Sequence, residues 1–148
     1  MLIETALVLD ILNNKHNVES YYENMCGIEN LIYEASDQGT KGMRLVAEVT
    51  LNRARNNPSP YAVCETVFDP YQFSWTITPK DKLRDYTELE LLHAAQIWFT
   101  YVYSDIEPIL SEDVLHYLNT DTASDLSWYD PSKVVLKHRD HAFLAGVR

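Results

Sequence analysis

Hydrophobic residues recur at helical spacing in the first part of the chain. They do so over residues 2–14, which are followed by the polar stretch NNKHN, and again at Ile28, Leu31, Ile32 and Ala35. Residues three and four apart share one face of an α-helix, so each pattern predicts a helix with one buried face. Gly39 follows the second pattern where a glycine commonly ends a helix. We therefore expect one helix over 2–14 and a short one that ends before Gly39.

Two longer helices are predicted further along. The first begins at Lys41 and carries the apolar stripe Met43, Val46, Ala47, Thr50, Leu51 and Ala54. The stretch NNPSP ends it, because proline cannot continue a helix. The second begins with Thr87 and Glu90, which have the spacing of a capping box, and continues through 102. We expect this second helix to be the buried centre of the domain.

Extended structure is predicted in two regions. AVCETVF and QFSW, within residues 62–75, flank an Asp-Pro break and predict two short strands around a turn. Near the C-terminus, VLHYL, KVVLKH and HAFLAG fit either strands or loops. We see no internal repeat. The pattern predicts an α+β fold, a helix-dominated single domain over 1–148, with a small β region in its middle.

The composition excludes several classes of function. The net charge is −10 and no run of Lys or Arg is present, which argues against a nucleic-acid partner. Cys26 and Cys64 are far apart in sequence, so a framework of several disulfides and a paired-cysteine metal site are not expected. A single disulfide bond between the two remains an option. None of the 4 glycines forms a phosphate-binding loop. We expect no cofactor and no metal.

No segment predicts export or membrane insertion. The start MLIETALVLDIL lacks basic residues and is interrupted by Glu4 and Asp10, unlike a signal peptide. AAQIWFTYVY is far shorter than the ~20 apolar residues that span a bilayer. We expect a soluble monomer without a signal peptide or transmembrane segment.

Glu34 is the carboxylate that stands out. It lies at the border of the apolar stripe 28–35 and in the last turn of that helix. Partial burial and the negative end of the helix dipole both disfavour the ionised form and raise a carboxyl pKa. A carboxyl group that stays protonated near neutral pH can act as the general acid in glycosidic cleavage. The alternative is a solvated helix charge.

Glu48 is the rival carboxylate. It falls outside the apolar stripe of its helix, with Arg44 one turn earlier and Asn52 one turn later. We therefore expect an exposed, salt-bridged side chain without a catalytic role.

Two aromatic segments have the composition of a sugar-binding cleft. PYQFSW, residues 70–75, combines three aromatic rings with an amide and a hydroxyl, and HYLN, residues 116–119, places Tyr117 and Asn119 on one face of a strand. Sugars stack on aromatic rings and bond to amide and hydroxyl groups. Packing in the core is the alternative for both segments.

The histidine and serine residues give only weak indications of a functional site. His138 and His141 flank Asp140, but their spacing matches no zinc motif, and a surface histidine cluster is the expected reading. No serine lies in a GxSxG elbow.

These segments, in their order along the chain, resemble the cell-wall hydrolase family typified by the spore cortex-lytic enzymes (SleB-type), which is found also in bacteriophages. The resemblance covers roughly residues 28–144. It is carried by YEA (33–35), GM (42–43), VAEVTLNRA (46–54), VCETVFDPYQFSW (63–75), LHYLN (115–119) and HAF (141–143).

The resemblance implies a lysozyme-like fold that acts on the glycan strands of bacterial peptidoglycan, with Glu34 as the catalytic acid. Relatives are usually lytic transglycosylases, which cleave between N-acetylmuramic acid and N-acetylglucosamine and leave a 1,6-anhydro ring. The implied saccharide-binding residues are Gln72, Phe73, Ser74, Trp75, Tyr117 and Asn119.

Four positions depart from the family pattern, and two of them are Ser36 and Asp37, which stand where relatives carry Arg-Gly. Gln38 stands where relatives usually carry a second acid, and Leu118 stands where they carry a histidine, so that a role for this histidine is lost or moved to His116. If the enzyme is instead a simple hydrolase, Asp37 and Asp69 are candidates for a second carboxylate.

The expected setting is a bacteriophage endolysin that accumulates in the host cytoplasm and reaches the wall after release, with a virion-borne lysin as the second option. Two rival functions stay open: a non-catalytic glycan-binding or virion structural protein, and a metal-dependent amidase that uses His116, His138 and His141.

Overall fold

The computed structural model describes residues 5, 17–69, 72–122 and 125–147, so the helix predicted over 2–14 lies, apart from Thr5, outside the described residues. The helices are α2 (Asn17–Ala35), α3 (Gly39–Ala54), α4 (Ala62–Val67) and α5 (Glu88–Tyr103). The strands are β1 (Val114–Asn119), β2 (Val134–His138) and β3 (His141–Ala145). The helix-dominated α+β class is confirmed.

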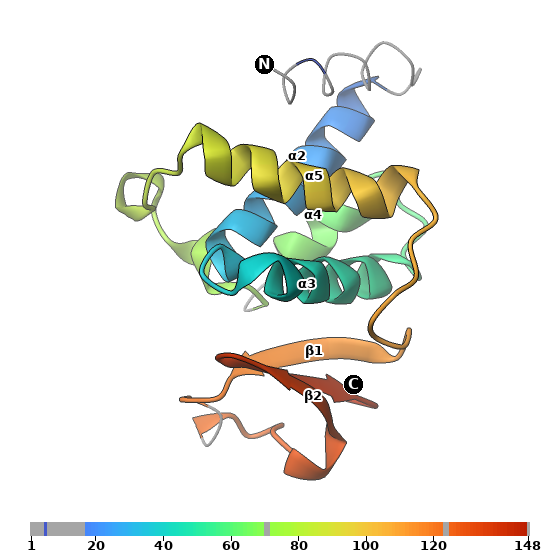
Figure 1. Cartoon of the computed structure of the whole chain (residues 1–148), viewed down its shortest axis with the longest axis vertical. Coiled ribbons are helices and arrows are strands. Elements are labelled where there is room, and N and C mark those ends of the chain that lie inside the picture. Colours follow the sequence, from blue (N-terminus) through green and yellow to red (C-terminus); the bar gives the residue numbers. More distant parts are fainter. Residues whose placement is uncertain (1–4, 6–16, 70–71, 123–124, 148) are drawn as a thin grey trace.

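Helix α3 is the centre of the molecule. Figure 1 shows the other helices on one side of α3 and the sheet on the other. Met43 and Val46 pack into the core formed with α2 and α5, whereas Leu45 and Val49 pack against Phe143 of β3. A helix covered on both sides buries more than the single stripe that its sequence displays. The expectation that the helix 87–102 is the buried centre is therefore wrong.

Helix α5 begins as its sequence predicts. The hydroxyl of Thr87 accepts the backbone N–H of Glu90 at 3.1 Å, and the Glu90 carboxylate accepts the N–H of Thr87 at 3.2 Å, which completes the capping box. Leu89 and Tyr103 are exposed, so this helix buries one face only. Among the described residues, no helix is both long enough and apolar enough to cross a membrane.

The β structure lies at the C-terminal end rather than in the middle. The three strands form one antiparallel sheet in the order β1-β3-β2, with Tyr117 opposite Phe143 and Asn119 opposite His141. The segments left open between strand and loop are therefore strands.

The strands predicted within 62–75 are wrong: residues 62–67 form α4 and residues 74–77 form a 3₁₀ turn. The reason lies in α2. The Glu23 carboxylate accepts the backbone N–H groups of Val63 at 2.7 Å and Cys64 at 2.8 Å, so it satisfies the start of α4. A disulfide between Cys26 and Cys64 ties the two helices together.

Glu48 is buried, with 4% of its surface exposed, and the expectation of an exposed salt bridge is wrong. Its carboxylate accepts the N–H groups of Ile109 at 2.9 Å and Leu110 at 2.7 Å and the hydroxyl of Tyr101. One turn later, Asn52 donates to the carbonyl of Val114 at 3.1 Å. The polar side of α3 thus binds the backbone that leads into β1.

We predict that Glu48→Ala destabilises the fold by about 3 kcal/mol, because two buried N–H groups lose their acceptor. Urea unfolding followed by circular dichroism measures the change. Glu112→Ala is the matched control, since Glu112 is 83% exposed and should change stability little. Equal effects of the two substitutions would contradict this role of Glu48.

We predict that reduction of the disulfide costs about 4 kcal/mol of unfolding free energy, as the chain-entropy model gives for cysteines separated by 38 positions. Urea titrations with and without reductant measure the difference. A double variant with Cys26→Ser and Cys64→Ser should unfold at the reduced midpoint in both conditions.

Candidate active site

Glu34 lies in the last turn of α2, partly buried. The hydroxyl of Tyr117, from β1, donates to its carboxylate at 2.9 Å. Burial raises the pKa of Glu34 to about 7, and the hydrogen bond from Tyr117 opposes this rise by favouring the ionised form. The border position and the raised pKa predicted for Glu34 are confirmed, with burial as the main cause.

Tyr117 is held by a set of rings. Its ring centre lies 4.8 Å from that of His141, 5.4 Å from Phe143 and 6.3 Å from Phe73. Burial and the negative charge of Glu34 raise the pKa of Tyr117 well above its usual value. The phenol therefore stays protonated and remains a hydrogen-bond donor to Glu34.

Trp75 is oriented by the helices beneath it. Its indole N–H donates to the side-chain oxygen of Asn30 at 2.8 Å, and the Asn30 amide donates to Thr50 at 3.3 Å. Its ring stacks on Tyr33 of α2, with 4.9 Å between the ring centres. This fixed geometry suits a ring that serves as a platform.

The other predicted site residues have different environments. Phe73 is buried and packs near Tyr117, whereas Ser74 is exposed at the start of the 3₁₀ turn. Gln72 accepts a hydrogen bond from the guanidinium of Arg53. Asn119 is exposed, and its side-chain oxygen accepts the N–H of Asp121 at 2.8 Å, so it caps the turn after β1.

A pocket of about 560 Å³ brings part of this set together. Its walls include Gln72, Phe73 and Tyr117 from the predicted site, and also the side chains Arg53, His116 and Trp128. Sequence reasoning did not single out Arg53 or Trp128. Arg53 lies within a segment that carries the resemblance, whereas Trp128 stands in a polar loop without a pattern.

A second hollow, of about 580 Å³, surrounds Glu23 and Trp98 and contains none of the predicted site residues.

The turn after Glu34 is held by the hairpin between β2 and β3. The Gln38 amide donates to the Asp140 carboxylate at 3.1 Å, and His138 donates to the Gln38 carbonyl at 2.9 Å. The side chain of Gln38 is buried and has a structural role. Gly39, predicted to end the preceding helix, is the first residue of α3 and has a φ of +74°.

The candidates for a second carboxylate make local contacts. Asp69 pairs with Arg53 at 3.5 Å, and Asp37 accepts the Gln38 amide at 3.0 Å. The histidines do not form a surface cluster, because His141 is buried against Tyr117. Within the part of the chain that the structure describes, no group of three or more His, Cys, Asp or Glu side chains could hold a metal ion.

Comparison with known proteins identifies the family. A sequence model of the family described as Cell Wall Hydrolase matches residues 37–144. The match contains every predicted saccharide-binding residue and begins three residues after Glu34. Neither the curated proteins nor the solved structures give a match. Because this match spans most of the chain, the chain belongs to the cell wall hydrolase family.

Proposed function

We propose that this cell wall hydrolase is a glycosidase that cleaves the peptidoglycan strand between N-acetylmuramic acid and N-acetylglucosamine, with Glu34 as its general acid. The observation that carries the proposal is the partly buried Glu34 carboxyl, whose pKa of about 7 keeps much of it protonated at neutral pH. It is bonded to Tyr117, which forms part of a pocket with aromatic walls. Glu34 is not among the residues that line this pocket and is connected to it through Tyr117. A carboxyl group that is protonated at neutral pH is what acid-catalysed cleavage of a glycosidic bond requires.

The first step transfers the proton of Glu34 to the glycosidic oxygen. The bond between this oxygen and C1 of N-acetylmuramic acid breaks, the bonding electrons stay with the oxygen, and N-acetylglucosamine leaves with a free hydroxyl. Tyr117 binds the resulting carboxylate of Glu34 through its hydroxyl and so stabilises the charge that appears.

The second step is the one that defines a lytic transglycosylase. The C6 hydroxyl of the same muramic acid attacks C1, and the Glu34 carboxylate takes the proton of this hydroxyl. The product is a 1,6-anhydro ring and Glu34 is again protonated. This route needs one carboxyl group, which fits a site where Asp69 is paired with Arg53 and Asp37 with Gln38. Attack by water instead would give a reducing sugar and define a muramidase.

We also propose that the protein is a bacteriophage endolysin. The Cys26–Cys64 disulfide supports a working location outside the reducing cytoplasm, because such bonds persist in oxidising compartments. This agrees with synthesis in the host cytoplasm followed by release to the wall. A virion-borne lysin would meet the same oxidising conditions.

We predict that Glu34→Gln abolishes the release of fragments from purified peptidoglycan, since it removes the transferable proton and keeps the shape. Mass spectrometry of the soluble products is the measurement. Wild-type products that end in 1,6-anhydro-muramic acid indicate a transglycosylase, and products heavier by one water indicate a muramidase. Unchanged release by the variant would rule out Glu34 as the acid. A wild-type protein that binds the wall and releases nothing would favour the non-catalytic glycan-binding function.

The same variant should be more stable than the wild type at alkaline pH. The Glu34 carboxyl has its pKa raised from 4.5 to about 7 on folding, so the folded wild type binds more protons and loses stability as the pH rises through this range. The loss approaches roughly 3 kcal/mol above pH 7. Urea unfolding at pH 4 and pH 8.5 should show equal stabilities at the lower pH and a stabilised Glu34→Gln at the higher one. A difference in stability between the two proteins that does not depend on pH would contradict this ionisation of Glu34.

We predict that the rate of wall lysis falls as the pH rises through about 7, where Glu34 loses its proton. Tyr117→Phe removes a hydrogen bond that lowers the pKa of Glu34, so the falling limb should move to higher pH. The measurement is the rate of turbidity loss of wall suspensions from pH 4 to pH 9. A lower rate with an unshifted limb would mean that Tyr117 only supports the fold.

A further inference from the structure

The pocket beside Tyr117 contains the largely buried cation Arg53, whose ion pair with Asp69 is long and lies toward solvent. The side chain of Arg53 is 17% exposed, and its nearest carboxylate, Asp69, lies at 3.5 Å and is itself 52% exposed. Its other described partner is the neutral amide of Gln72. A guanidinium stays charged at every physiological pH, and a buried charge is costly unless it is paired at close range. The geometry around Arg53 is therefore suited to an anion that enters the pocket.

A second feature of the same pocket is a histidine with an unused hydrogen-bonding atom. The Nδ1 atom of His116 is buried and has no hydrogen-bond partner among the described residues. Buried polar atoms in folded proteins are nearly always bonded, so this nitrogen has an unused bonding position, as does Nδ1 of the buried His141. Burial, followed by the charge of Arg53, lowers the pKa of His116, which is thus neutral at pH 7 and able to accept or donate one bond.

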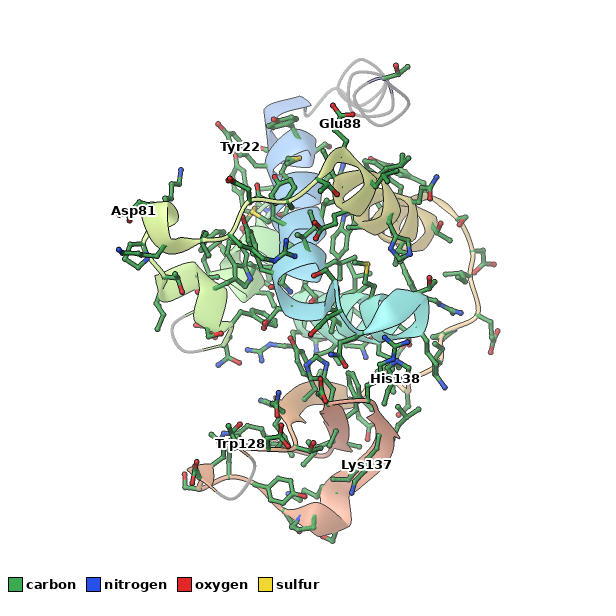
Figure 2. All side chains as sticks on the ribbon, turned by 60° about the vertical axis from the view of Figure 1, so that its left-hand side comes forward. Tyr22, Asp81, Glu88, Trp128, Lys137 and His138 are labelled. Carbon is green, nitrogen blue, oxygen red and sulfur yellow. A yellow bond between two sulfur atoms is a disulfide. The ribbon has the colours of Figure 1, made fainter. Side chains whose placement is uncertain are left out.

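The third feature is a ring that can carry a sugar. Trp128 is 38% exposed, and its ring centre lies 5.5 Å from that of His116. Figure 2 shows Trp128 on the sheet side of the molecule, and Arg53 belongs to α3 on the helical side. A ligand in the pocket would lie between an aromatic face and a guanidinium.

We propose that this pocket binds the muramic acid unit of the glycan through a carboxylate that Arg53 recognises, with the sugar ring against Trp128. The inference rests on the proposed function and adds its substrate selectivity. N-Acetylmuramic acid differs from N-acetylglucosamine by a lactyl ether that ends in a carboxyl group, and in the wall this group carries a peptide that has carboxylates of its own. A planar guanidinium binds a carboxylate through two parallel hydrogen bonds. Because the whole chain has a charge of −10, an anionic ligand needs such a local cation.

The test is an NMR titration of the full chain, in which the indole N–H signals report binding. Three ligands too small to be cleaved are compared: N-acetylglucosamine, N-acetylmuramic acid with a free lactyl carboxylate, and muramoyl dipeptide, whose carboxylate lies on the peptide. We expect at least one acidic ligand to bind about tenfold more tightly than N-acetylglucosamine, as a charge-assisted hydrogen bond provides. Whichever acidic ligand is preferred identifies the source of the carboxylate.

Arg53→Gln should reduce this preference to within about twofold while N-acetylglucosamine affinity is kept. Arg55→Gln is the matched control, because Arg55 is two residues away, is 48% exposed and pairs with the exposed Glu112. Equal binding of all three ligands by the wild type would overturn the inference, and this comparison needs no variant. A preference that persists in a folded Arg53→Gln would overturn it as well.

The outcome is separable from that of the proposed function. If the wild type releases anhydro-muramic fragments and binds all three ligands equally, the selectivity of the pocket is wrong and the cleavage stands. If the acidic ligand is preferred and no fragments are released, the pocket stands and the cleavage is wrong.

Discussion

The burial of α3 between the helices and the sheet is the constraint on which the rest of the structure depends. One side of α3 completes the helical core and the other packs against Phe143 and the first strand. A helix in this position must also satisfy the polar groups that it buries, and Glu48 does so by binding the backbone N–H groups of Ile109 and Leu110. This contact sets the path of the chain into β1, and β1 carries Tyr117.

The site follows from this arrangement. Once β1 lies against α3, the hydroxyl of Tyr117 reaches Glu34 at the end of α2, and two side chains 83 positions apart form one hydrogen bond. Burial of Glu34 raises its pKa, and the bond from Tyr117 limits this rise. The raised pKa of Glu34 therefore depends on the way in which the helical part and the sheet meet.

The same junction gives the pocket two chemically different walls. α3 and the segment after α4 contribute Arg53 and Gln72, while β1 and the loop beyond it contribute His116 and Trp128. The polar wall can bond to the substituents of a sugar and the aromatic wall can cover its ring.

The sequence by itself determined the features that arise within a few residues. The stripe of α3, the capping box at Thr87 and the border position of Glu34 depend on neighbours three or four positions apart, and all three are present in the structure. The ordered segments from YEA to HAF were also sufficient to indicate the family.

Only the tertiary structure decided the features that depend on distant contacts. Residues 62–67 are helical because Glu23 of α2 satisfies their first N–H groups, and a local pattern does not contain this information. Glu48 is buried because a distant loop supplies its donors, although its own helix predicts exposure. Arg53 and Trp128 meet at one pocket only after α3 and the segment beyond β1 come together. In each case the energy of a buried polar group is set by partners far along the chain, which no periodicity in the sequence encodes.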